Sequence, residues 1–171
     1  SAASDVYKRQ KYFRELSGEL TVNNRIFCKN SIVNAVLNSK YNTALEKQID
    51  CFFNISIDGL LGIDDISLCS LFSNTLDNAI EACEKIQEVS KRQISLKARF
   101  DKGYFSYEIS NSKKNTVTVK KDHFLTEKAD KTTHGFGVQN VRDMVSKYEG
   151  DMDISYTEDR FTVTVLLSLI H

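Results

Sequence analysis

The chain has 171 residues, of which 41% are hydrophobic and 27% are charged, and its 23 basic residues equal its 23 acidic residues in number. This balance gives no overall electric field that would recruit nucleic acid or an anionic membrane. No apolar run approaches the roughly 20 residues that span a bilayer, and the start does not resemble a signal peptide. Length and composition therefore predict one soluble globular domain with an appendage.

The four cysteines and three histidines show no spacing that is typical of a metal or redox site. There is no C-x-x-C pair, and Cys83 falls in an apolar helical stripe. We therefore expect reduced core cysteines in a cytoplasmic setting, and no metal bound through Cys or His.

The first part of the chain is predicted to be helical. Apolar residues recur at helical spacing from Val6 to Leu20, which indicates the tail of a longer helix that begins before this sequence does. A second helix is predicted from about Ser31, the expected N-cap, to Lys47. Neither segment can bury its apolar stripe alone, so each needs a partner, such as a second copy of the chain.

The rest of the chain alternates between strand and helix patterns. Strands are predicted at Ile49–Ile57, Gln93–Phe100, Tyr104–Ser110, Asp151–Tyr156 and Arg160–Leu169, and helices from Asp64 or Asp65 to about Val89 and at Gly137–Tyr148. The turn Asp101-Lys102-Gly103 is a strong hairpin signal, and the polar stretch Asn111–Thr133 is a long loop of the functional or disordered kind. This order predicts an α/β two-layer sandwich, with helices on one face of the sheet.

The stretch Ser70–Lys85 divides into two faces when it is placed on a helix. Its apolar stripe comprises Leu68, Phe72, Leu76, Ala79, Ile80 and Cys83. Asn74, Asn78 and Glu81 gather on the opposite face, with Asp77 beside them. Two carboxamides in mid-helix are unusual because Asn is a poor helix former. The face is either merely solvated, or it coordinates a hard cation such as Mg²⁺ through oxygen ligands.

The sequence His134-Gly135-Phe136-Gly137 lies where the long polar loop meets a helix start. Glycines there let the backbone approach a ligand, and the free N–H groups of the first helical turn form an anion site. The loop would act as a lid over phosphates, with Lys128 adding positive charge. The alternatives are a simple turn and a solvated lysine. Together the two signals predict a nucleotide site that lacks the familiar phosphate-loop motifs.

These residues carry a family resemblance. N-T-L-D-N-A-I-E-A (Asn74–Ala82) resembles the asparagine box of the GHKL superfamily of ATP-binding domains, and H-G-F-G-V-Q-N-V (His134–Val141) resembles its second glycine box. Asn30–Tyr41 and Thr126–Gly137 are most similar to sensor histidine kinases of the accessory-gene-regulator, peptide quorum-sensing type. The resemblance implies a Bergerat-type mixed sheet. It also implies a remnant of the dimerisation helix with a connecting helix in residues 1–47, and an ATP-binding catalytic domain in residues 48–171.

The resemblance also implies residue roles. Asn78 matches the Mg²⁺ ligand, and Asn74 matches the position that orients the γ-phosphate or the incoming acceptor. Asn74 is therefore the expected catalytic residue. The remaining expected nucleotide-binding residues are Asp77, Asn111, Lys128, Gly135, Phe136 and Gly137. ATP-hydrolysing members usually have a Glu at the position of Asn74. Because an amide cannot take a proton from water, Asn74 favours phosphoryl transfer to a protein side chain over hydrolysis.

The sequence departs from the family pattern in two places. The first glycine box is missing, and Asn111 stands where its adenine-reading Asp would be. A neutral acceptor should read the adenine amine more weakly than a carboxylate does. No histidine follows the acceptor pattern, in which His is closely followed by Asp or Asn in an early helix. We therefore expect the sequence to begin in the second helix of the dimerisation hairpin, after the acceptor.

The resulting prediction is the ATP-binding catalytic domain of a bacterial two-component sensor histidine kinase that uses ATP and Mg²⁺. Expected partners are a second copy through the dimerisation helices and a response regulator, with no nucleic acid and no membrane contact except through segments outside this sequence. Two alternatives stay open: a degenerate nucleotide-binding interaction module, and a serine kinase of the anti-sigma-factor type. Asn74 and the helical appendage count against the second alternative.

Overall fold

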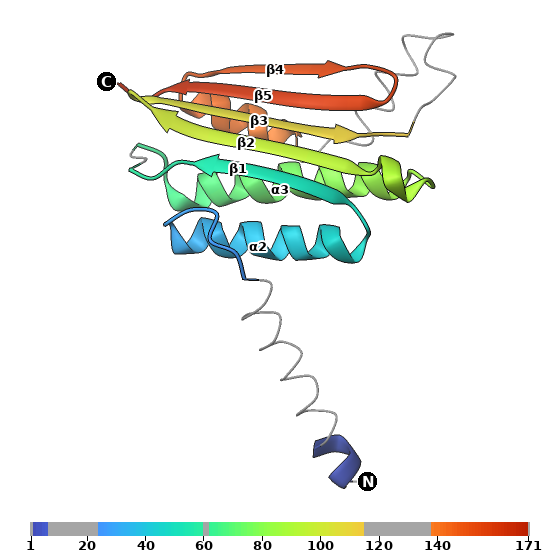
Figure 1. Cartoon of the computed structure of the whole chain (residues 1–171). Coiled ribbons are helices and arrows are strands. Elements are labelled where there is room, and N and C mark those ends of the chain that lie inside the picture. The colour runs from blue at the N-terminus through green and yellow to red at the C-terminus, as the bar shows by residue number, and fades with distance from the viewer. Residues whose placement is uncertain (1, 7–23, 60–61, 115–137, 171) are drawn as a thin grey trace.

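The computed structural model describes residues 2–6, 24–59, 62–114 and 138–170. Within these ranges five strands form one sheet in the order β1-β2-β3-β5-β4 (Figure 1). The strands are β1 (Asp50–Ser56), β2 (Gln93–Asp101), β3 (Tyr104–Ser112), β4 (Asp151–Tyr156) and β5 (Arg160–Ser168). β1 runs parallel to β2, and the other neighbouring strands are antiparallel. The predicted mixed sheet is therefore confirmed.

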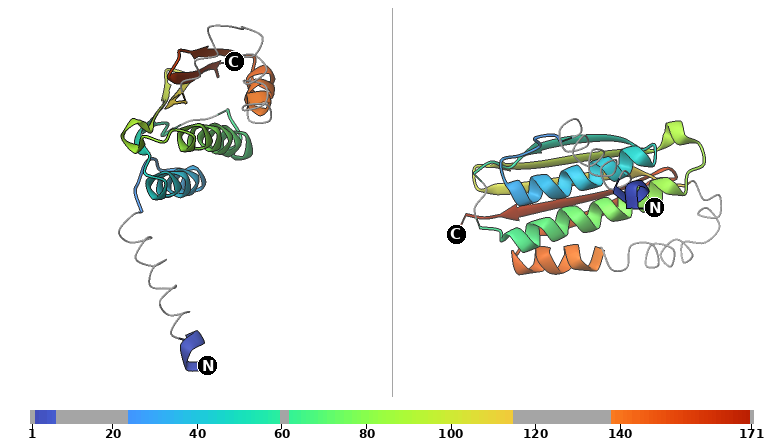
Figure 2. Two further views of the ribbon diagram at one scale, coloured as in Figure 1. Left: turned by 90° about the vertical axis from the view of Figure 1, so that its right-hand side faces the viewer. Right: turned by 90° about the horizontal axis from the view of Figure 1, so that it is seen from below.

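Helices cover one face of this sheet. α2 (Ser31–Glu46), α3 (Asp65–Glu84) and the helical residues 138–147 lie side by side below it, as the right-hand view of Figure 2 shows. α3 supplies the crossover that a parallel pair such as β1 and β2 requires. The predicted two-layer α/β sandwich is confirmed.

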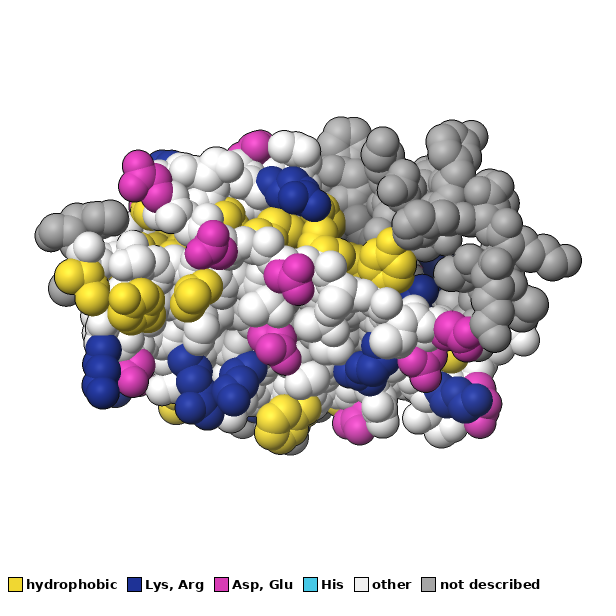
Figure 3. Space-filling model, turned by 90° about the horizontal axis from the view of Figure 1, so that it is seen from above, with side chains coloured by type: hydrophobic (Ala, Val, Ile, Leu, Met, Phe, Trp, Pro, Cys, Tyr) yellow, Lys and Arg dark blue, Asp and Glu magenta, His cyan; other side chains and the backbone are white. Residues whose placement is uncertain are grey.

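The core lies between the two layers. The apolar stripe that was predicted for α3 is buried throughout, and alternate residues of β2, β3 and β5 face it from the sheet. Phe72 of α3 meets Tyr107 of β3 edge to face, with ring centroids 5.2 Å apart. The opposite face of the sheet is open, and charged side chains of both signs are spread over it (Figure 3). The alternation of apolar and polar residues along the strands thus produces one buried face and one solvent-exposed face of the sheet.

α2 belongs to this core. Val33, Leu37 and Ala44 are fully buried on it. The predicted N-cap is wrong by one residue: the side chain of Asn30, not that of Ser31, accepts from the backbone N–H groups at positions 32 and 33. A carboxamide oxygen one residue earlier reaches the free donors of the first turn and leaves Ser31 inside the helix.

α3 ends earlier than predicted, at Glu84 instead of about Val89. Residues Val89–Lys91 form a separate turn of 3-10 helix. The side chain of Arg92 donates to the carbonyl oxygens of Glu84 and Ile86 at the end of the helix. This tertiary contact supplies the stop that no Gly or Pro in the local sequence signals.

β3 continues two residues beyond the predicted end at Ser110. Asn111 pairs with Ile94 of β2 and with Phe161 of β5, so it is a strand residue and not the first residue of the loop. Polar side chains at the end of a strand suggested a loop, whereas backbone pairing on both sides keeps the strand extended.

Two glycines are required by their surroundings. Gly103 has a φ of +81° in the two-residue turn between β2 and β3, which confirms the predicted hairpin. At Gly150, which follows the helical residues 138–147, an added Cβ would lie 2.7 Å from the Leu166 carbonyl oxygen. Only glycine lets the chain pass this close to β5.

The four cysteines are free thiols, two of them buried. Burial raises the pKa of Cys83 to about 11 and that of Cys51 to about 12, so both stay protonated at neutral pH. The prediction was of reduced core cysteines, and Cys28 and Cys83 are the two that are buried in the core. Within the described residues, no helix is both long enough and apolar enough to cross a membrane.

Candidate functional site

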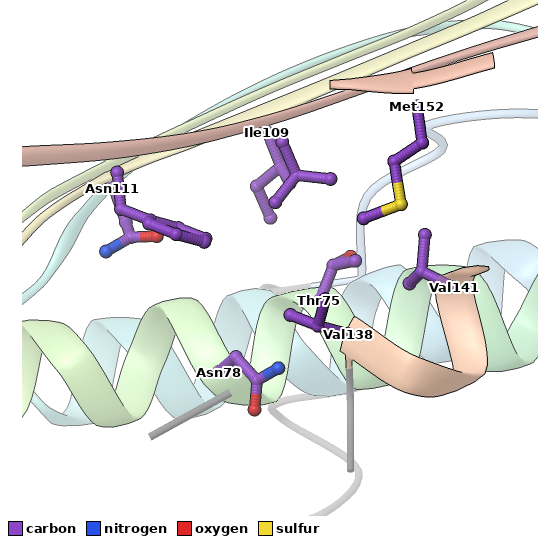
Figure 4. Close-up of a pocket in the computed structure, with 9 residues that line it drawn as sticks. Thr75, Asn78, Ile109, Asn111, Val138, Val141 and Met152 are labelled. Carbon is purple, nitrogen blue, oxygen red and sulfur yellow. The ribbon is translucent and has the colours of Figure 1, made fainter. Parts of the chain in front are cut away.

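A small recess opens between α3, the sheet and the helical residues 138–147. Its lining comprises Thr75, Asn78, Ile109, Asn111, Val138, Val141, Met152, Phe161 and Val163. Figure 4 shows Ile109 and Asn111 extending from the sheet, with Thr75 and Asn78 on α3 below them. The recess therefore has apolar walls and a small number of polar groups, which is the usual composition of a ligand pocket.

The α3 wall presents Asn78. Asn78 lies three positions after Thr75 and four before Ala82, both of which are buried, so it lies at the flank of the buried face of α3, beside the interlayer space. Asn78 is partly exposed there and lines the recess. The predicted metal ligand thus lies at a cavity and not on a fully solvated surface.

The β3 wall presents Asn111, a residue that is only 3% exposed. Its Nδ2 donates to the carbonyl oxygen of Ser112 at 2.9 Å. This bond fixes the orientation of the carboxamide and leaves the side-chain oxygen as the acceptor for a ligand. Asn78 and Asn111, which lie 33 positions apart in the sequence, are brought to the same recess.

Asn74 and Asp77 are placed differently from Asn78. Asn74 lies one turn earlier on α3 and is partly buried. Asp77 points toward α2, where its carboxylate pairs with Lys40 at 2.6 Å. The ion pair of Asp77 thus joins α3 to α2. Asn78, the next residue, lines the recess, and Asp77 is not among the lining residues.

The remaining predicted site residues, Lys128, Gly135, Phe136 and Gly137, lie outside the described residues, as do residues 115–133 of the predicted loop and residues 7–20 of the predicted helix tail. The helix that follows Gly137 is described from residue 138 onward. Its first described residue, Val138, lines the recess together with Val141. The described part of this helix therefore forms the third wall of the cavity.

The helix of residues 138–147 is attached to α3 at its other end. The hydroxyl of Tyr148 donates to the carboxylate of Asp64, the N-cap of α3, at 2.7 Å. Lys147 pairs with the same carboxylate at 3.2 Å. The two helices that border the recess are thus joined by a charged cluster at the end away from Asn111.

Sequence reasoning missed the buried pair of Thr75 and Tyr107. Their hydroxyl oxygens lie 2.6 Å apart, and Thr75 lines the recess. A threonine in mid-helix between two asparagines was the available signal. Tyr107, the partner of Thr75, lies 32 positions later in the sequence, on strand β3. A local sequence pattern cannot identify such a pair.

The lining of the recess combines apolar side chains with two carboxamide groups, which suits a partly apolar ligand that carries a hydrogen-bond donor and a group that binds a hard cation. Asn111 offers a buried acceptor, and Asn78 offers a carboxamide oxygen of the kind that Mg²⁺ accepts. Among the described residues, no group of three or more His, Cys, Asp or Glu side chains is arranged to hold a metal ion. A cation here would therefore need ligands from the bound molecule as well.

Comparison with known proteins gives both a family and a fold. The family model described as "GHKL domain" matches residues 63–168, which is more than half of the chain. A comparison with curated proteins found no match.

Solved histidine kinase structures share the fold at low sequence identity. The nucleotide-free catalytic domain of histidine kinase ThkA has a TM-score of 0.62 and 17% identity, over 84% of this chain and 95% of that one. Histidine kinase AdeS of Acinetobacter baumannii has a TM-score of 0.59 and 14% identity, over 99% of this chain and 81% of that one. Full-length ShkA in complex with AMPPNP has a TM-score of 0.58 and 12% identity, over 98% of this chain and 38% of that one. The chain belongs to the GHKL domain family and has the fold of histidine kinase catalytic domains.

Proposed function

We propose that this chain is the ATP-binding catalytic domain of a sensor histidine kinase, which transfers the γ-phosphoryl group of ATP to a histidine outside this chain. The observation that carries the proposal is the convergence of Asn78 and Asn111 on one apolar-walled recess in a GHKL domain. The two side chains come from different elements, α3 and β3. Asn78 is the expected ligand of Mg²⁺, and Asn111 is the expected acceptor for the adenine amine.

The residues around the recess suit an adenine nucleotide. The walls of Ile109 and Val163 are apolar and can pack against a flat base. The oxygen of Asn111, oriented by the bond from its Nδ2 to Ser112, would accept the adenine amine. The recess is lined by described residues from five elements: α3, β3, β4, β5 and the helical residues 138–147.

Asn78 would hold Mg²⁺ together with phosphate oxygens of the nucleotide. Mg²⁺ takes few protein ligands and obtains the others from phosphates and water, so one carboxamide is a sufficient contribution from the helix. The ion would neutralise charge on the transferred group. Gly135, Phe136, Gly137 and Lys128 remain our proposed phosphate contacts on the lid.

Asn74 would orient the reacting groups from one turn earlier on the same helix. Its carboxamide cannot act as a base toward water, so we expect transfer to a protein acceptor and slow hydrolysis. Asp77 is a weaker candidate for nucleotide contact, because its carboxylate is paired with Lys40 of α2.

We further infer a bacterial, cytoplasmic kinase of the peptide quorum-sensing type, on the basis of the motifs Asn30–Tyr41 and Thr126–Gly137. Its partners would be a second copy, through helices ahead of α2, and a response regulator. The predicted division into residues 1–47 and 48–171 also remains a proposal. In the described structure, buried residues of α2 pack into the same core as residues of the second part.

The replacement Asn78→Ala tests the proposal. We expect the variant to keep its fold, because Asn78 lies outside the apolar stripe, and to lose at least about tenfold in affinity for an ATP analogue when Mg²⁺ is present. Calorimetry with and without Mg²⁺ measures the affinity, and circular dichroism checks the fold.

Asn54→Ala is the matched control, because Asn54 is exposed on the open face of β1. It should bind like the parent. Equal Mg²⁺-dependent affinity in the parent and in Asn78→Ala would refute the metal-ligand role. A parent that binds no nucleotide at all would refute the proposed function.

A further inference from the structure

The hydroxyl groups of Thr75 and Tyr107 form a buried bridge between α3 and the sheet. We propose that these two residues are positioning residues, which set the separation between the two polar walls of the nucleotide recess. The inference deepens the proposed function and rests on it. It assigns to Thr75 and Tyr107 a role that differs from the expected roles of Asn78 and Asn111.

The bridge is short, directional and dry. The two hydroxyl oxygens lie 2.6 Å apart, Tyr107 is completely buried, and Thr75 is 6% exposed. The Thr75 hydroxyl donates to the carbonyl oxygen of Leu71 at 2.7 Å, so Tyr107 is the donor to Thr75. Both hydroxyl protons are thus used, and the bridge has one arrangement of donors and acceptors.

The bridge joins the elements that carry the site. Tyr107 lies on β3 two and four residues before Ile109 and Asn111, and all three point to the helical side of the sheet. Thr75 lies between Asn74 and Asn78 on α3. A change in the length of this bond therefore moves the helix wall that holds Asn78 relative to the strand wall that holds Asn111.

A second contact between α3 and the sheet helps to explain why one hydrogen bond can set the position of Asn78 relative to Asn111. Beyond Asn78, the thiol of Cys83 donates weakly to the carbonyl oxygens of Gln93 and Ser112, each at 3.6 Å. Among the described side chains, these contacts and the hydroxyl bridge tie α3 to the sheet on both sides of Asn78. Apolar packing keeps the helix against the sheet but resists rotation of the helix less strictly than a directional bond does.

The test uses Tyr107→Phe, Thr75→Val and the double variant in the whole chain. Tyr107→Phe keeps the ring that packs on Phe72, and Thr75→Val keeps the side-chain shape. We expect each single variant to bind the Mg²⁺ complex of an ATP analogue about five- to tenfold more weakly, at a temperature where all proteins are folded. The double variant should lose no more than the single ones, because all three break the same bond.

Two controls separate positioning from general stability. Thr75→Ser keeps the hydroxyl and should restore affinity to within about twofold of the parent. Tyr104→Phe removes a hydroxyl from the same strand on the open face, where Tyr104 is exposed, and should bind like the parent. If Thr75→Val fails to fold because Tyr107 is left without its acceptor, Tyr107→Phe and the double variant still decide the question.

A readout without nucleotide keeps this inference separate from the proposed function. The carboxamide NMR signals of Asn78 and Asn111 should shift in Tyr107→Phe and stay in place in Tyr104→Phe, whether or not the parent binds nucleotide. A parent that binds no nucleotide overturns the proposed function alone. Unchanged carboxamide signals, or unchanged affinity with a lower melting temperature, would make the bridge purely structural and overturn this inference.

Discussion

The carboxylate of Asp64 joins two segments that lie 84 positions apart in the sequence. It accepts the Tyr148 hydroxyl at 2.7 Å, and the backbone N–H and hydroxyl of Ser67 at 2.8 Å each. These donors, with Tyr148 the strongest, hold the pKa of Asp64 well below its usual range. One side chain thus caps α3 and anchors the end of the helix that borders the recess.

This lowered pKa predicts a pH-dependent contribution to stability. The ionised form of Asp64 stabilises the fold at pH values above the unfolded-state pKa of about 3.9, and the contribution is lost as the pH falls toward the folded-state pKa. Asp64→Asn should therefore be less stable than the parent at pH 7, and the difference should shrink below about pH 4. Urea denaturation of both proteins across this range measures it.

Glu81→Gln, a change at an exposed position on the same helix, is the control and should show no comparable difference. A stability gap between the parent and Asp64→Asn that stays constant from pH 7 to pH 3 would contradict the role of the charge.

Single residues were predictable where a local pattern presents them. Asn78 stands out because a carboxamide is unusual in mid-helix, and the structure places it at a cavity. Asn111 was noticed as a substitute for an expected Asp, but its position inside β3 depends on pairing with two other strands. Thr75 and Tyr107 were not found, because their roles follow from contact between distant segments.

At the scale of helices and strands, Arg92 fixes where two helices end. Its guanidinium donates to the carbonyl oxygens of Lys47 after α2 and Ile86 after α3, each at 2.8 Å, and to that of Glu84 at 3.3 Å. Carbonyl groups at helix ends lack intrahelical donors and carry partial negative charge. Arg92 therefore supplies both hydrogen bonds and charge to two C-termini at once.

The replacement Arg92→Lys should destabilise the chain by about 1–3 kcal/mol, because a single ammonium group cannot reach three diverging carbonyl groups. The free energy of unfolding in urea measures the loss. Arg99→Lys, at an exposed position on the open face of β2, should change stability by less than about 0.5 kcal/mol. Equal effects of the two replacements would show that Arg92 acts only as a surface charge.

The existence and type of the five strands and of α2 and α3 followed from their periods. The 3.6-residue stripe of α3 and the alternation in β2, β3 and β5 identified the buried faces correctly. The ends were less accurate, because the end of α3 depends on Arg92 and the end of β3 depends on its neighbours. The local sequence determines which face of a helix or strand is buried, whereas contacts with distant residues often determine where the helix or strand ends.

At the scale of the whole molecule, the chain ahead of α2 is held against the domain. The carboxamide of Asn38 exchanges two hydrogen bonds with the backbone of Arg25, both at 2.7 Å, and Asn34 accepts from the Phe27 N–H at 2.7 Å. The Phe27 ring packs on Phe53 with centroids 5.4 Å apart. The segment that enters the domain is therefore fixed to α2, and α2 to the core.

The overall architecture was predictable because alternating strands and amphipathic helices leave few ways to bury their apolar faces. The site was predictable only in outline. Motifs named the asparagines and the glycines, but the apolar walls come from four different elements, and only the fold brings them together.

Transfer of phosphate to a supplied acceptor tests the central claim most directly. The chain is incubated with labelled ATP and Mg²⁺, with and without a separate helical fragment that carries a histidine closely followed by Asp or Asn. We predict acid-labile phosphate on that histidine, and none on the chain itself. Transfer should be slow and should rise with acceptor concentration, because the acceptor is not tethered. Acid-labile phosphate on His123 or His134 would contradict the claim that the acceptor histidine lies outside this chain. Fast ATP hydrolysis without any acceptor, and no transfer to the supplied histidine, would contradict the assignment as a histidine kinase catalytic domain.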